Sequence, residues 1–194
     1  PSLPTNSGIF SPIKVIAPAG CLVNPTEPAP VSVLIDAGQR IPDTLFGALA
    51  SIMPERILAA SNGACTTCML FGRTEHSHGK YFICHESIAG GSGASHYFDG
   101  LSGVQVYLTN TSNMPIEATE IEYPDIMLEQ YYLRRDSGGA GQFRGGCGIQ
   151  REYKICSDGM AVNCLGDRQK FQPWGLDGGM AGAAGAFYLV DGQT

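Results

Sequence analysis

A glycine-rich run at residues 136–146 is the part of the sequence best suited to binding an anion. It reads Asp-Ser-Gly-Gly-Ala-Gly-Gln-Phe-Arg-Gly-Gly. Consecutive glycines let successive backbone N–H groups point at one phosphate or carboxylate, and the Arg144 guanidinium could clamp the same anion. The candidate anion or substrate contacts are therefore Asp136, Gly138, Gly139, Gly141 and Arg144.

The same run also has a structural interpretation, in which its glycines only make tight turns between strands. No Gly-Lys-Ser/Thr follows at P-loop spacing, and no clear helix opens here as a dinucleotide fingerprint requires. Ser137 lies in no Gly-x-Ser-x-Gly elbow and no histidine can be assigned as its partner, so no catalytic residue is identified. An anion site and structural turns both stay open.

Cysteines and histidines between residues 65 and 96 form a second candidate site, for zinc or for redox chemistry. The two-residue gap between Cys65 and Cys68 suits one tetrahedral zinc ion. The later residues lack the paired spacing of a structural zinc site, and glycines replace the helix that a thioredoxin-like motif needs. These later residues are His76, His78, Cys84, His85 and His96. We favour buried thiols with surface histidines and assign no metal ligand.

Two weaker patterns have simple structural explanations. Gly90, Gly91 and Gly93 suit close backbone packing at a bend. Glu120 and Glu122 would share one face of an extended segment bounded by Pro115 and Pro124, with Glu117 on the other face. A solvated strand face is favoured there over acid–base or metal chemistry.

One helix and several strands would position these residues. Ile41, Leu45, Ala48, Leu49 and Ile52 recur at helical spacing and predict a helix over 41–53 that ends at Pro54, with a short helical turn over 55–60. Alternation predicts strands around 31–35, 104–108 and 149–155. A run rich in tyrosine and leucine predicts another over 126–135, and an Asp-Gly turn signal follows one over 187–190. The sequence therefore predicts an α+β, β-rich mixed domain with glycine-rich loops, which forms one domain over 1–194.

Composition excludes several classes of protein. Of 194 residues only 15% are charged and 26 are glycine, and the net charge of -6 leaves no basic stripe for nucleic acid. No apolar run reaches the length of a membrane span. Seven cysteines, an odd number in a chain of this length, favour reduced thiols and a cytoplasmic location.

Read in order, many blocks of the sequence resemble the hydantoinase B family, which includes the B-type component of N-methylhydantoinase, the α-type subunit of acetone carboxylase and the C-terminal half of 5-oxoprolinase. The most specific block is 136–151. The others are Asn6-Ser7-Gly8, Pro12-Ile13, Pro18-Ala19-Gly20, Asn24-Pro25, 28–31, Gln39-Arg40-Ile41, 47–50, Pro54-Glu55-Arg56, 90–94 with Asp99-Gly100, 109–117, Glu120 ahead of Tyr123-Pro124, and 173–176 with Gly178-Gly179.

The resemblance implies that the chain is the C-terminal part of a longer subunit. In this family an A-type partner uses ATP to activate a carbonyl, and the B-type subunit supports the hydrolysis or carboxylation that follows. The implied activity is that of a cyclic-amide hydrolase of the N-methylhydantoinase or 5-oxoprolinase type within a hetero-oligomer. A ketone carboxylase subunit and a non-catalytic assembly domain are the alternatives, and we expect the fragment to be inactive alone.

The resemblance also implies cofactors for the full complex, namely ATP and a divalent metal. The family's histidine and aspartate metal ligands lie upstream of the matched region. No metal ligand is therefore carried over to this chain. The substrate implied is a small carbonyl compound or cyclic amide.

Overall fold

The computed structural model describes residues 6–31 and 34–190 and divides the chain into two compact units, 1–34 and 35–194. In the first unit the 3-10 helix η1 (Ser7–Phe10) is capped by Asn6, whose side-chain oxygen accepts from the Gly8 N–H at 2.9 Å. An isolated bridge joins Cys21 and Asn24. The prediction of one domain over 1–194 stays a prediction.

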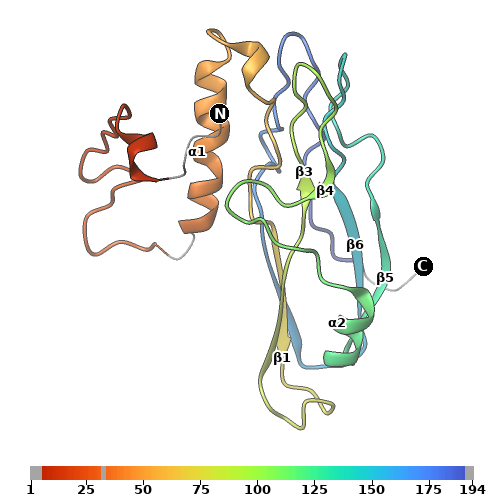
Figure 1. Ribbon diagram of the computed structural model, residues 1–194. Coiled ribbons are helices and arrows are strands. Elements are labelled where there is room, and N and C mark those ends of the chain that lie inside the picture. Colours follow the sequence, from red (N-terminus) through yellow and green to blue (C-terminus); the bar gives the residue numbers. More distant parts are fainter. Residues whose placement is uncertain (1–5, 32–33, 191–194) are drawn as a thin grey trace. The chain divides into compact units, whose positions relative to one another are not determined.

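The predicted helix is present but shifted toward the N-terminus. Helix α1 covers Leu34–Leu49, and residues 50–52 form a turn (Figure 1). The predicted start was wrong because Pro42, which favours the first turn of a helix, lies in its interior. The strand predicted over 31–35 is wrong at Ile35, which is helical, while residues 32–33 lie outside the described residues.

Helix α1 packs through a polar face. Gln39 and Asp43, one turn apart, are buried, whereas Ile41 and Leu45 are about half exposed. The apolar spacing thus predicted the helix correctly but not the face that it buries. The short turn predicted after it is the 3-10 helix η2 (Pro54–Arg56).

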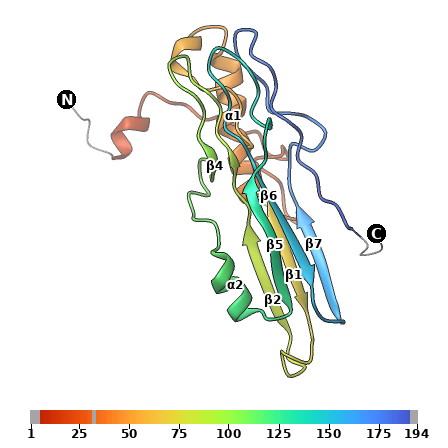
Figure 2. The ribbon, with the colours of Figure 1, turned by 90° about the vertical axis from the view of Figure 1, so that its right-hand side faces the viewer.

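Two antiparallel sheets form the centre of the second unit. One has the strand order β2-β1-β7, with β1 (Thr67–Gly72) between β2 (Phe82–Ser87) and β7 (Met160–Leu165). The other pairs β5 (Ile126–Leu133) with β6 (Ile149–Ile155), with a register shift after Leu128. Figure 2 shows these five strands lying together. A small ladder joins β3 (Gly90–Gly91) to β4 (Ser102–Val104).

The hydrophobic core lies between the two large sheets. Cys68, Leu70 and Cys84 of the first sheet pack with Ile126 and Leu128 of the second. Burial, with nearby Cys164 and Glu86, raises the pKa of Cys68 to about 12, and burial and Glu86 raise that of Cys84 to about 11. Both thiols are therefore protonated and unreactive at neutral pH.

A buried ion pair crosses the same interior. The Arg151 guanidinium pairs with Glu86, lies 3.9 Å from the centre of the Tyr131 ring, and donates to the Met114 carbonyl at 2.7 Å. The Tyr153 hydroxyl donates to the same glutamate. Burial and this carboxylate raise the pKa of Tyr153, which keeps the phenol protonated.

The strands predicted around 126–135 and 149–155 are confirmed as β5 and β6, and three other predictions need correction. Strand β4 ends at Val104, because Tyr107 takes a left-handed φ of 51° and the chain turns. The segment predicted to be extended between Pro115 and Pro124 contains helix α2 (Ile116–Glu122), since proline at a helix N-cap starts a helix rather than preventing one. Residues 187–190 form no strand.

The α+β, β-rich fold class is confirmed. Within the residues that the structure describes, no helix combines the length and the apolar character needed to cross a membrane.

Candidate functional site

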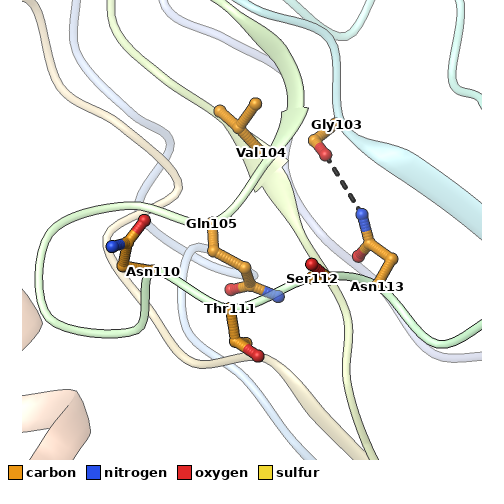
Figure 3. Close-up of a pocket in the computed structure, with 7 residues that line it drawn as sticks. All are labelled: Gly103, Val104, Gln105, Asn110, Thr111, Ser112 and Asn113. Atoms are coloured by element: carbon orange, nitrogen blue, oxygen red, sulfur yellow. Dashed lines mark hydrogen bonds between the residues drawn. The ribbon is translucent and has the colours of Figure 1, made fainter.

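A cavity of about 430 Å³ lies where β4 ends and the chain loops toward α2 (Figure 3). We call it the neutral pocket, because its lining carries amide, hydroxyl and backbone groups and no charged side chain. Its lining residues are Gly103, Val104, Gln105, Asn110, Thr111, Ser112 and Asn113.

Two amide side chains of the neutral pocket are fixed by hydrogen bonds. Asn113 accepts from the Ala89 N–H at 3.1 Å and donates to the Gly103 carbonyl at 3.2 Å, the bond drawn in Figure 3. Gln105 donates through Nε2 to the Ser87 carbonyl at 3.1 Å. Its Oε1 is buried without a donor among the described residues. A buried unpaired acceptor costs about 1–3 kcal/mol. A ligand N–H would relieve this cost if the Gln105 side chain turned its Oε1 into the cavity.

The loop beside the pocket is held in a strained conformation by α1. Tyr107 and Asn110 have positive φ values of 51° and 30°. The Leu108 N–H donates to the Gln39 Oε1 at 3.2 Å, and Gln39 Nε2 donates to Thr109. Such backbone costs about 1–3 kcal/mol per residue and persists only where its surroundings impose it.

Asp43 is the centre of that support. Its carboxylate accepts from the Tyr107 hydroxyl at 2.5 Å, from Arg168 Nη2 at 2.8 Å and from the Ser61 N–H at 3.3 Å, with Arg40 Nη1 at 3.9 Å. Burial and the Asp43 hydrogen bond raise the pKa of Tyr107, so it remains a phenol donor. The Asp43 carboxylate is thus fully paired by these groups, and it is not among the residues that line the neutral pocket.

The glycine-rich loop adjoins the neutral pocket. The Gly103 N–H donates to the Cys147 carbonyl at 2.9 Å, and the Cys147 N–H donates to Ser102 Oγ at 2.9 Å. Close backbone packing explains several of its glycines. A Cβ at Gly138 would collide with the Gly145 carbonyl, and one at Gly146 with the Leu101 carbonyl.

Three backbone N–H groups of this loop already have acceptors. Arg144 donates to Asp99 Oδ1 at 2.7 Å, Gly145 to the Gly139 carbonyl at 3.0 Å, and Gly146 to the Ser92 carbonyl at 3.0 Å. The structure thus brings Gly138, Gly139 and Arg144 together, with Asp136 at a turn of φ 56°. These three N–H groups are therefore not free to bind an anion. Anion binding by Asp136, Gly138, Gly139, Gly141 and Arg144 stays a prediction.

Cys147 is a thiol with a lowered pKa that the sequence did not reveal. Arg144 Nη1 lies 3.2 Å from its sulfur. Partial burial acts to raise the pKa of this thiol, but the Gly138 N–H, Ser102, Arg144 and Ser137 together lower it below its usual value. Only the fold brings these donors to one sulfur, so spacing could not have shown it.

The structure separates the cysteines and histidines considered for zinc. Cys68 lies in the core with its sulfur 3.8 Å from that of Cys164, and Cys65 contacts Ser87 at 3.4 Å. His76 contacts Asp125. Across residues 6–31 and 34–190, no three His, Cys, Asp or Glu side chains are arranged to hold a metal ion. All seven cysteines are free thiols.

The sequence also missed the polar support of the neutral pocket. In the sequence, the run 109–117 and the block Gln39-Arg40-Ile41 indicate only a resemblance to the family and not a pocket. Gln105 carries no sequence signal, because an amide in a short strand-like run is ordinary until its burial is known.

Comparison with known proteins places the chain in a family over its whole length. The family described as Hydantoinase B/oxoprolinase matches residues 1–194. Protein MJ0963 of Methanocaldococcus jannaschii is 47% identical over 100% of this chain and 33% of its own length. The putative B-type subunit of a D-/L-hydantoinase from a Pseudomonas species is 34% identical over 100% of this chain and 32% of its own length. The chain thus spans about a third of these relatives.

Two solved structures share the fold. The ATP-dependent caprolactamase from Pseudomonas jessenii matches 73% of this chain and 25% of its own at 28% identity, with a TM-score of 0.64. A nucleotide-free acetone carboxylase matches 78% of this chain and 20% of its own at 21% identity, with a TM-score of 0.62. With the family match over all 194 residues, these findings show that the chain belongs to the hydantoinase B/oxoprolinase family.

Proposed function

We propose that this chain is part of an ATP-dependent hydrolase of cyclic amides, of the N-methylhydantoinase or 5-oxoprolinase type. Two relatives support this reading, one named as a B-type hydantoinase subunit and one as an ATP-dependent caprolactamase. Hydantoin and caprolactam are both cyclic amides. The caprolactamase and hydantoinase names also support a hetero-oligomer with an ATP-using A-type partner, which we place in the cytoplasm.

The observation that carries this proposal is the neutral pocket with its unpaired Gln105 Oε1. The ring amide shared by these compounds is an uncharged group with an N–H donor beside a carbonyl acceptor. Gln105 Oε1 would accept from the ring N–H, while the hydroxyls of Thr111 and Ser112 would donate to the ring carbonyl. An uncharged lining avoids the cost of burying an unpaired charge against such a ring.

The reaction adds one water across the amide bond. The water oxygen joins the carbonyl carbon, the ring C–N bond breaks, and the nitrogen takes up a proton, which gives an amino acid from a lactam and an N-carbamoyl amino acid from a hydantoin. ATP, used by the partner, would supply activation of the poor amide electrophile. The described residues do not fit a metal site, and no step is assigned to a metal here.

We also propose that Arg144, with Asp136, Gly138, Gly139 and Gly141, contacts the phosphate or carboxylate that forms during turnover. The exposed Arg144 side chain contacts the Gly145 carbonyl at 3.3 Å, so it can turn toward an anion without breaking the core. Arg144→Ala in the full complex should impair turnover and leave thermal unfolding unchanged. Unchanged kinetics would remove this role.

A ketone carboxylase is the second candidate, favoured by the structural likeness to acetone carboxylase. It ranks second because a ketone has no N–H group and would leave Gln105 Oε1 unpaired. A non-catalytic assembly domain is the third reading.

One experiment separates these readings. The complete subunit and its ATP-using partner are assayed with hydantoin, 5-oxoproline and caprolactam for ATP-dependent ring opening, and with acetone and bicarbonate for carboxylation. We expect ring opening, and Gln105→Leu should raise KM by roughly 10-fold or more, since about 1–3 kcal/mol of hydrogen bonding is lost. Ser112→Ala tests the pocket without touching a structural hydrogen bond.

Gln172→Leu is the matched control, because Gln172 is an exposed glutamine outside the pocket. Carboxylation without ring opening would select the second candidate. If the complex is active and its KM is unchanged in Gln105→Leu and Ser112→Ala, the neutral pocket is not the substrate site.

A further inference from the structure

A buried aspartate fixes a histidine at the far end of the β1–β2 hairpin. Asp125 is only 2% exposed. Its carboxylate accepts from Ser157 Oγ at 2.5 Å, from Thr74 Oγ1 at 2.7 Å and from the His76 Nδ1 at 2.8 Å. The Asp125 carbonyl also accepts from the Cys156 N–H at 2.9 Å. The hairpin, the start of β5 and the β6–β7 turn therefore meet at one carboxylate.

These hydrogen bonds decide how His76 presents its ring. Burial acts to raise the pKa of Asp125, but its bonds from Ser157, Thr74 and His76 lower it on balance, so it stays ionised. An ionised carboxylate requires a proton on His76 Nδ1. The other ring nitrogen, Nε2, has no partner among the described residues, and the side chain is 56% exposed. Nε2 is therefore available to a ligand.

His76 lines a second cavity, of about 240 Å³, which we call the charged pocket. Its other lining residues are Ser77, Lys80, Phe82, Glu122, Tyr123, Pro124 and Asp125. The volume is below the roughly 300–1,000 Å³ of pockets for drug-sized ligands, so it suits a small molecule.

The lining of the charged pocket combines both signs of charge with an aromatic wall. Lys80 is cationic and Glu122 is anionic, while the Asp125 carboxylate already accepts from His76 Nδ1. The rings of Phe82 and Tyr123 lie 5.8 Å apart, and the Tyr123 hydroxyl donates to the Ile83 carbonyl at 3.3 Å. A multiply charged anion would be repelled by Glu122 and a simple cation by Lys80.

We propose that the charged pocket is a second ligand site that binds a small zwitterionic amino acid. The ligand carboxylate contacts Lys80, its ammonium group donates to Glu122 and to His76 Nε2, and its side chain packs on Phe82 and Tyr123. This site goes beyond the proposed hydrolase reaction. Only one link rests on that function: ring opening of a lactam such as caprolactam releases an amino acid, which this site would then bind as product.

Equilibrium binding to the full chain tests the proposal without any assay of turnover. The probes are L-leucine, isocaproate, which lacks the ammonium group, and isoamylamine, which lacks the carboxylate. We expect leucine to bind at least 10-fold more tightly than either analogue, with chemical shift changes at residues of the charged pocket.

Variants assign the two ends of the ligand. Lys80→Met should weaken leucine binding several-fold, and its side chain makes no hydrogen bond or ion pair in the described structure, so folding is unaffected. Glu122→Gln should remove the preference for leucine over isocaproate. His85→Ala, an exposed histidine on β2 outside the pocket, is the control and should change nothing.

Three results would overturn the proposal. The first is equal binding of leucine and isocaproate, which would indicate a simple anion site. The second is no binding of leucine at millimolar concentration. The third is an equal loss of affinity in His85→Ala and Lys80→Met. Each leaves ring opening by the complex unaffected, so failure here is distinguishable from failure of the proposed function.

Discussion

Each of the two pockets has a buried aspartate beside it, and the two aspartates differ in their hydrogen-bond and ion-pair partners. Asp43, beneath the neutral pocket, is bound by Arg168 and approached by Arg40, and both are permanent cations. Asp125, beneath the charged pocket, is bound by two hydroxyls and His76. The first carboxylate is neutralised inside the protein, whereas the second depends on a residue at the surface.

This difference determines what each pocket can select. With its supporting charge fully paired, the neutral pocket can distinguish ligands only by shape and by hydrogen bonds such as that of Gln105. The charged pocket presents Lys80 and Glu122 to solvent and can distinguish ligands by charge. The two pockets thus differ in the charge of their lining residues as well as in the partners of the aspartates beside them.

The largest expected effect is on stability, when the Asp43 support is removed. Asp43→Ala leaves the largely buried Arg168 without its partner, which typically costs about 3–5 kcal/mol. Urea unfolding of this variant and of Asp158→Ala, an exposed aspartate, gives the comparison. A loss below about 1 kcal/mol would show that the arginines find other partners and that Asp43 is not the support we describe.

The second-largest expected effect is a loss of stability at acid pH, when Asp125 becomes protonated. The folded pKa of Asp125 is lowered by its hydrogen bonds, so its contribution to stability is present above the unfolded value of about 3.9 and is lost as pH falls through the folded pKa. Asp125→Asn should be less stable than the wild type at pH 6, with the difference shrinking below pH 4. Urea unfolding across this range measures it, and a constant difference would contradict the assignment.

Salt concentration should affect ligand binding at the two pockets differently, although the effect is smaller than those of the aspartate substitutions. The Debye length falls from more than 10 Å to only a few ångströms between about 0.05 and 0.5 M salt, and exposed charges are screened accordingly. Leucine binding at the charged pocket should weaken several-fold over this range, whereas KM for a cyclic amide at the neutral pocket should change by less than about twofold. Equal responses would show that the two pockets do not differ as described.

The sequence predicted the parts of the fold that are set by local pattern. A run rich in tyrosine and leucine indicated β5, alternation indicated β6, and helical spacing indicated α1. The same reasoning failed where tertiary contacts decide the outcome. Pro42 lies inside α1 between the buried Gln39 and Asp43, whose contacts offset the lost helix hydrogen bond.

The sites were less predictable than the fold. Glycine content identified the loop at 136–146, but its partner Ser92 lies far away in the chain. Asp125 and His76 are 49 residues apart, and no spacing rule joins a hairpin tip to the start of a distant strand. The sequence could offer the residue types, but only the packing of the end of the β1–β2 hairpin against the start of β5 brings them together.

The smallest expected effect concerns Cys147 and tests what Arg144 does. Because its pKa is lowered, Cys147 should reach half of its maximal rate of alkylation by iodoacetamide at a lower pH than the exposed Cys156, as followed by mass spectrometry of the two peptides. Arg144→Gln should raise the Cys147 midpoint only slightly, since the Gly138 N–H and Ser102 remain in place. If this variant shifts the midpoint and leaves turnover unchanged, Arg144 serves the thiol rather than a bound anion. If turnover falls as well, the glycine-rich loop and the neutral pocket belong to one functional site. The comparison to be made is then between that combined site and the charged pocket.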